Sequence, residues 1–115
     1  MHAAVAALNG PQDIVDEMRE SFQIRRDFIL KKFNEVEGIE CIIPESTFFL
    51  LSRFPNSQKN SLELTNVLLE EAGILGIPGI TFGGAGERHI CFSITTSLPV
   101  LEKAAEFLTR IIPTL

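Results

Sequence analysis

The first third of the chain carries apolar residues at helical spacing. Between residues 12 and 37, apolar side chains recur three, four or seven positions apart: Ile14, Met18, Phe22, Ile29, Phe33 and Val36. This spacing predicts one long helix with an apolar stripe and a charged opposite face. Asn9-Gly10-Pro11 separates it from a short helix-forming run over residues 3–8, and Gly38 is a suitable stop at its end.

Two strands are predicted after this helix. Residues 39–43 are a short strand candidate, which Pro44 closes. The segment 46–54 contains the continuous apolar run Thr47-Phe48-Phe49-Leu50-Leu51. Such a run, flanked by turn residues, is typical of a central strand covered on both faces.

A third helix follows a polar loop. Asn60 or Ser61 can cap its start, and Gly73 ends it after Ala72. Residues 74–77 then form a very short strand candidate, before Pro78-Gly79 turns the chain.

The last strand has the clearest alternation in the sequence. Over residues 87–95, which follow a glycine-rich loop at 82–86, the even positions are Ile90, Phe92 and Ile94, and the odd positions are His89, Cys91 and Ser93. One face of this strand is therefore expected to pack in the core, and the other face points away from it. Ser97 and Pro99 suit the start of a final helix, with its buried side formed by Val100, Leu101, Ala104, Ala105, Leu108 and Ile111.

The order of these elements predicts an α+β fold in a single domain spanning residues 1–115. A small mixed or antiparallel sheet of about three to four strands is expected, covered by helices and preceded by the long N-terminal helix. The length of 115 residues fits one domain with one modest core.

Charge and cysteine content narrow the function classes. The net charge is −5, so a nucleic-acid surface, which needs a basic stripe, is not expected. No apolar run is long enough for a membrane span. Cys41 and Cys91 are 50 positions apart without a Cys-x-x-Cys pattern, which indicates reduced thiols in a cytoplasmic protein.

Candidate catalytic groups are few, and each has a plainer interpretation. His89 and Cys91 share a strand face, but they lie about 6–7 Å apart along it, too far for a direct nucleophile–base pair. Gly83-Gly84-Ala85-Gly86 does not open a helix or end in Gly-Lys-Ser/Thr, which favours a tight loop over phosphate binding. Arg88 is either a carboxylate anchor or a rim arginine paired with an acid. No His, Cys, Asp or Glu set has metal-ligand spacing.

Two stretches nevertheless resemble a known family. The run from Leu69 to Gly83, LEEAGILGIPGITFG, is similar to the "l-e-x-x-g-v-x-x-x-P-G-x-x-F-G" pattern of class I/II, fold-type-I aminotransferases, which depend on pyridoxal phosphate. Arg25-Arg26-Asp27 resembles the family's "R-R-D", and Pro44 to Phe49 resembles its "P-x-G-A-F-Y". Each motif is weak alone, but together they cover nearly the whole chain in the expected order, as in aspartate aminotransferase-like enzymes.

The resemblance implies the C-terminal small domain of such an enzyme, which closes over the substrate. In the family a large N-terminal domain holds pyridoxal phosphate on a lysine in a Ser-x-x-Lys context. That pattern is absent around the four lysines of this chain, Lys31, Lys32, Lys59 and Lys103. No catalytic or cofactor-binding residue is therefore expected here, and the missing large domain is the expected partner.

The resemblance also implies a substrate site in the last strand. The family places there an arginine that forms a two-pronged pair with the substrate's α-carboxylate. Aligning Gly86-Glu87 with the family's "G-E" puts Cys91 at that position, and Arg88 lies three residues earlier. Arg88 replaces the missing arginine only if the strand is bulged or the alignment shifts.

Two functions remain open from the sequence. The first is the substrate-closing domain of an enzyme that transfers amino groups between amino acids and 2-oxo acids, without activity of its own. The second is a free-standing α+β binding or oligomerisation module derived from that domain, which exposes an apolar face and forms a homodimer.

Overall fold

Residues 1–115 are described by a computed structural model that contains four helices and a four-stranded sheet. The helices and strands are, in order, α1 (His2–Asn9), α2 (Asp13–Asn34), β1 (Glu40–Cys41), β2 (Phe49–Arg53), α3 (Ser61–Ala72), β3 (Ile77–Pro78), β4 (His89–Ser93) and α4 (Leu98–Ile111). Short 3₁₀ turns lie at Gly79–Phe82, Gly84–Gly86 and Ile112–Thr114. None of the helices is long and apolar enough to cross a bilayer.

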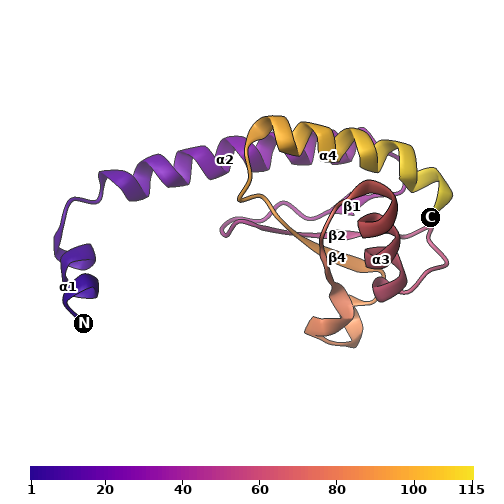
Figure 1. The fold of residues 1–115 in the computed structure, drawn as a ribbon, viewed down its shortest axis with the longest axis horizontal. Coiled ribbons are helices and arrows are strands. Elements are labelled where there is room, and N and C mark those ends of the chain that lie inside the picture. The colour runs from indigo at the N-terminus through magenta and orange to yellow at the C-terminus, as the bar shows by residue number, and fades with distance from the viewer.

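The sheet is antiparallel throughout, in the order β1-β2-β4-β3. The C-terminal half of α2 and α4 lie side by side over one face of it, and α3 packs at one end (Figure 1). The core between these layers contains Phe33, Leu50, Leu64, Ile90 and Leu108, all almost fully buried. This arrangement confirms the predicted α+β class.

Helix α3 begins and ends where the sequence predicts. The Asn60 side chain accepts hydrogen bonds from the backbone of Leu62 and Glu63, and the Glu63 carboxylate accepts one from the Asn60 N–H. Gly73 follows in the left-handed conformation that glycine adopts without steric cost. Both ends of α3 are therefore fixed by local sequence.

The N-terminal arm, residues 1–24, leaves most of its apolar side chains exposed. The predicted helix over 12–37 is confirmed, with narrower bounds, but Ile14 and Met18 are more than half exposed and no residue of α1 is buried. The arm projects from the rest of the chain (Figure 1), and the molecule measures 50 × 29 × 24 Å. Its radius of gyration, 16.1 Å, exceeds the roughly 13 Å of a compact chain of this size.

Two strand predictions are corrected by the structure. Strand β2 is central, but its burial alternates, so only one of its faces is covered and the expectation of two covered faces is wrong. The third strand is Ile77–Pro78 and not 74–77, because only these two residues pair with β4. The alternation predicted for β4 is confirmed on its even side, where Ile90, Phe92 and Ile94 are buried.

Candidate functional site on the uncovered sheet face

The glycine-rich segment before β4 is a structural turn. A Cβ atom on Gly79 would collide with the Gly86 carbonyl oxygen, so two backbone segments pass in direct contact. Such an approach is open only to glycine. The Pro78-Gly79 pair and the glycines that follow thus position the start of β4, and no part of this loop opens a helix that could bind phosphate.

Glu87 ties this turn to the start of α3. Its Oε1 accepts hydrogen bonds from the backbone N–H of Ser61 and, at 3.1 Å, of Arg88. The Ser61 N–H, followed by that of Arg88, holds the pKa of the Glu87 carboxyl below its usual range. A carboxylate at a helix N-terminus also interacts favourably with the helix dipole. Glu87 is therefore a positioning residue for β4.

Arg88 lies in the turn before β4 and away from Cys91. Its φ is +60°, its side chain is exposed, and its guanidinium has no carboxylate within 4.0 Å. Its carbonyl accepts a hydrogen bond from the Phe54 N–H at 2.9 Å. The structure therefore does not bring Arg88 beside Cys91, whose cross-strand neighbours are Leu51 and Ile77.

Cys91 occupies the middle of the sheet face that no helix covers. It is 8% exposed, and burial raises the pKa of its thiol above the usual range. His89 lies on the same face opposite Arg53, and its Nδ1 is 2.9 Å from the Glu87 carbonyl oxygen. Because the thiol stays protonated at neutral pH and has no base beside it, Cys91 is not an activated nucleophile.

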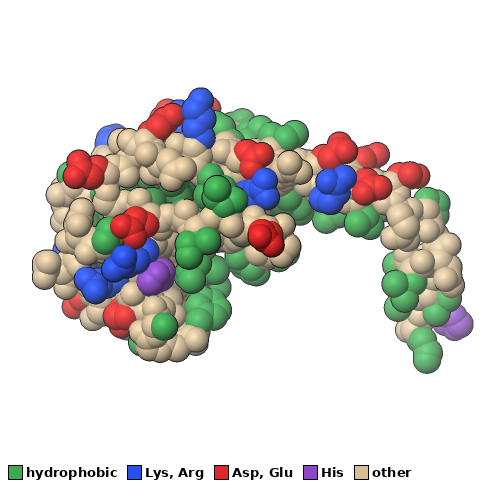
Figure 2. Space-filling view, turned by 180° about the vertical axis from the view of Figure 1, so that it is seen from behind, with side chains coloured by type: hydrophobic (Ala, Val, Ile, Leu, Met, Phe, Trp, Pro, Cys, Tyr) green, Lys and Arg blue, Asp and Glu red, His purple; other side chains and the backbone are tan.

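The uncovered face, defined by Phe49, Leu51, Arg53, Ile77, His89, Cys91 and Ser93, is apolar with a charged edge. Phe49, Leu51 and Ile77 are 39%, 44% and 42% exposed. Arg53 Nη1 lies 3.1 Å from Glu40 Oε2 at one end of the face. Viewed from behind, hydrophobic side chains gather next to a group of charged ones over the body of the molecule (Figure 2). An apolar patch with a polar rim is typical of an interaction surface.

The lysines do not form a cofactor pocket. Lys31 and Lys103 are exposed on helices, and Lys59 lies in the loop before α3. Lys32 Nζ is 3.9 Å from Glu35 Oε2 on the surface of α2. None of the four lines one of the main cavities. The four lysines are therefore not placed to hold a cofactor by a covalent bond to its carbonyl group.

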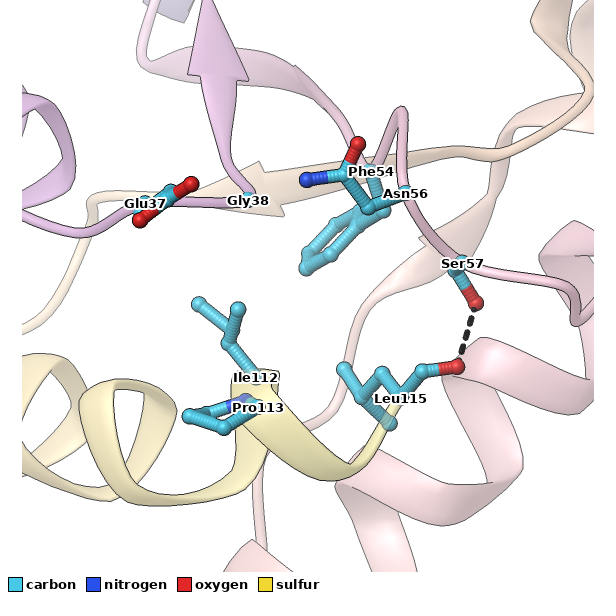
Figure 3. A pocket seen from close by; sticks show the side chains of 8 residues that line it. All are labelled: Glu37, Gly38, Phe54, Asn56, Ser57, Ile112, Pro113 and Leu115. Atoms are coloured by element: carbon cyan, nitrogen blue, oxygen red, sulfur yellow. Dashed lines mark hydrogen bonds between the residues drawn. The ribbon is translucent and has the colours of Figure 1, made fainter.

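A cavity near the C-terminal end of the chain also lacks a group of side chains suited to catalysis. It measures about 290 Å³, and Glu37, Phe54, Ser57 and Leu115 are among its lining residues (Figure 3). The Ser57 hydroxyl donates to the Leu115 carbonyl at 2.9 Å. Glu37 is the only ionisable side chain in the lining, and no group of His, Cys, Asp or Glu elsewhere could hold a metal.

Sequence reasoning missed the neighbours of Cys91. Leu51 was hidden in a continuous apolar run, where alternation cannot be seen, and Ile77 sits in a strand of two residues. It also missed Thr47, which has a φ of +74° in the turn before β2, an uncommon conformation for a β-branched residue. Phe48 and Phe49, which follow this turn, are exposed.

Comparisons with known proteins agree on one family. The model of aminotransferase class I and II matches residues 1–108. The aspartate aminotransferase of Bacillus subtilis is 36% identical over 96% of this chain, and that of Rhizobium meliloti 38% over 90%. Among solved structures, the alanine aminotransferase of Pyrococcus furiosus is 29% identical over 98% of the chain with a TM-score of 0.92. The chain spans only 29% of the B. subtilis and P. furiosus proteins and 27% of the R. meliloti protein.

Proposed function

The chain belongs to the class I and II aminotransferase family, and from this premise we propose that it is the substrate-closing part of a pyridoxal-phosphate-dependent aminotransferase. Amino-group transfer then requires a second part, which supplies the cofactor and its lysine. The 115 residues alone do not catalyse this reaction.

One observation carries the proposal. The fold matches that of a solved alanine aminotransferase over 98% of this chain, yet spans 29% of that protein. Two features of the molecule support it: the four lysines lie outside the main cavities, and the uncovered face and the arm expose apolar side chains. A domain that works against a larger partner has such surfaces.

The substrate site is proposed to lie at Cys91 on the uncovered face. In the family an arginine at this position pairs with the substrate's carboxylate, whereas here Leu51 and Ile77 flank a protonated thiol. Arg53, on the same face, is already paired with Glu40. We therefore expect this chain to bind an amino-acid carboxylate weakly.

A chimera tests both parts of the proposal. The chain replaces the matching 29% of the B. subtilis aspartate aminotransferase, and cofactor absorbance and aspartate transamination are measured. We expect the chimera to hold pyridoxal phosphate and to turn over slowly. Cys91→Arg should raise kcat/KM for aspartate about tenfold or more, since a charged hydrogen-bonded pair contributes about 1.5–3 kcal/mol.

The controls separate charge from size. Cys91→Ala removes the thiol without adding a cation and should leave kcat/KM unchanged. A cofactor spectrum that survives dialysis of the 115-residue chain alone would overturn the proposal, as would a chimera that folds but binds no cofactor.

A second candidate, a free-standing module, is favoured by the exposed arm. Val5, Leu8, Ile14 and Met18 are at least half exposed in this chain, which gives a homodimer an apolar surface to bury. Light scattering on the isolated chain distinguishes the two functions, because a discrete dimer supports the module and a monomer that the missing domain binds supports the enzyme. Cys41 and Cys91 are both unpaired, which fits the cytoplasm in either case.

A further inference from the structure

Strand pairing places an apolar row next to a polar row on the uncovered face. The apolar row consists of three cross-strand neighbours, Leu51, Cys91 and Ile77. The polar row consists of three residues that are likewise in register, Glu40, Arg53 and His89. Residues two positions apart on a strand share a face and lie about 6–7 Å from each other. A ligand that lies across the apolar row can therefore reach the polar row with one end.

Arg53 has donors to spare for such a ligand. Its guanidinium makes one hydrogen bond, from Nη1 to Glu40 Oε2 at 3.1 Å. A guanidinium carries five N–H donors, so those on Nη2 and Nε remain available to a carboxylate, which can bind them in a two-pronged geometry. Because both members of the Glu40 pair are largely exposed, an incoming carboxylate can also displace Glu40 at small cost.

His89 lies opposite Arg53 but offers an anion no further donor in its neutral form. Its Nδ1 is 2.9 Å from the Glu87 carbonyl oxygen. A carbonyl oxygen only accepts hydrogen bonds, so Nδ1 carries the hydrogen and Nε2 of the neutral ring is an acceptor. Arg53 is therefore the one permanent cation on the uncovered face.

The apolar row determines what can lie between Arg53 and the position of Cys91. Leu51 and Ile77, which are 44% and 42% exposed, flank the Cys91 thiol and offer a carboxylate neither a charge nor a donor. They can take up methylene groups instead, because burial of each methylene from water is favourable. A carboxylate next to the reacting carbon would meet only this row, whereas one at the end of a methylene chain reaches Arg53.

We propose that the amino substrate of the complete enzyme is an ω-amino acid, whose methylene chain crosses the apolar row and whose carboxylate binds Arg53. This inference rests on the proposed function, which supplies the amino transfer and places the substrate at Cys91. Arg53 is then the specificity-determining residue of this face. Simple α-amino acids are poor substrates, because their carboxylate stays beside Cys91 without a cation.

The first test measures binding to the 115-residue chain without any cofactor. Hexanoate supplies the carboxylate and the methylene chain, and hexanamide is its neutral counterpart of similar shape. NMR titration follows the Leu51 and Ile77 methyl groups and the Nε–H of Arg53. Hexanoate should shift all of these signals and bind about tenfold or more tightly than hexanamide, because hydrogen bonds between charged groups are the stronger ones.

Matched variants locate the anchor of the carboxylate. Arg53→Gln should weaken hexanoate binding about tenfold or more, whereas Arg19→Gln, which changes an exposed arginine paired with Asp16 on α2, should not. Glu40→Gln removes the competing carboxylate and should strengthen hexanoate binding by up to about fivefold.

The second test measures substrate choice in the chimera described above. Its kcat/KM for 6-aminohexanoate should exceed that for alanine about tenfold or more. Arg53→Gln should abolish this preference, mainly by raising KM for 6-aminohexanoate. Cys91→Arg places a cation beside the reacting carbon and should reverse the preference toward alanine.

Hexanoate that binds no better than hexanamide would overturn the Arg53 anchor, and so would an Arg53→Gln chain that binds hexanoate undiminished. An active chimera that prefers alanine would overturn the assignment of the substrate class and leave the proposed function standing. A hexanoate footprint on the isolated chain, together with a folded chimera that binds no cofactor, would instead overturn the proposed function and leave the Arg53 anchor standing.

Discussion

The two faces of one sheet show how differently adjacent residues contribute to this chain. On the covered face, Leu50 and Ile90 are completely buried. On the uncovered face, Leu51 and Ile77 are just over two-fifths exposed. Full burial of an aliphatic side chain contributes about 1.5–3 kcal/mol, so the covered face stabilises the isolated domain. The uncovered face keeps much of its apolar surface available for a partner.

Truncating two adjacent side chains of β2, Leu50 and Leu51, should give the largest difference in stability between the two faces. Leu50→Ala removes a fully buried side chain and should lower the free energy of unfolding by about 2–5 kcal/mol. Leu51→Ala, one residue on, should cost less than about 1 kcal/mol, because its side chain is already partly in water. Urea unfolding of both variants measures the difference. Equal losses would mean that the second face is also closed in the isolated chain.

The glycine turn after β3 allows a second test of the uncovered face, because this turn positions β3 and therefore Ile77. Gly79→Ala would push a methyl group into the Gly86 carbonyl oxygen and should destabilise the chain by about 1–3 kcal/mol. Gly84→Ala is the matched control, since nothing lies within 4 Å of its added Cβ, and it should change stability by about 0.5 kcal/mol or less. Thermal unfolding followed by circular dichroism measures both.

The sequence was most informative where structure is set locally. The ends of α3 follow from Asn60 and Gly73, and the covered side of β4 follows from its alternation. The exposure of one face of β2 could not be predicted from the sequence. A continuous apolar run has the same pattern whether its second face packs against a helix or is exposed. The stripe through Ile14 and Met18 likewise predicted a helix correctly, but spacing alone does not say whether those side chains are buried, and they are more than half exposed.

The candidate site was predictable only through the resemblance. Cys91 was assigned by counting from Gly86-Glu87, and its role remains a prediction. Its surroundings depend on cross-strand register, which places Leu51 and Ile77 beside it from distant parts of the chain. Arg88 could not be placed from strand alternation, because it lies in a left-handed turn before β4.

Removing the cap of α3 should have a smaller effect. Asn60→Ala deletes the side chain that accepts from the Leu62 and Glu63 N–H groups, at a cost of about 1 kcal/mol. Asn66→Ala, exposed in the same helix, is the control and should be neutral or slightly stabilising. Chemical denaturation distinguishes them. An Asn60→Ala variant as stable as the control would show that packing of Leu64 and Leu68 alone holds α3 on the covered face.

The hydrogen bond from the Ser61 N–H to Glu87 predicts how the stability of the chain changes with pH. Because hydrogen bonds lower the pKa of Glu87 in the folded chain, its contribution is present above the ordinary glutamate pKa of about 4.3. It is lost as the pH falls from there through the lowered value. Glu87→Gln should therefore flatten the fall in stability below about pH 4.3. Unfolding curves between neutral and acidic pH measure this slope.

The smallest expected effect lies on the uncovered face, at the pair of Arg53 and Glu40. The two side chains are 3.1 Å apart but 44% and 59% exposed, so water screens their attraction and a coupling of about 0.2–1 kcal/mol is expected. A double-mutant cycle with Arg53→Ala and Glu40→Ala isolates that coupling, and it should shrink further in high salt. A coupling well above about 1 kcal/mol would mean that this end of the face is already shielded from water in the isolated chain. The contrast between the two faces would then hold only around Leu51 and Ile77, and the surface proposed to meet a partner would be correspondingly smaller.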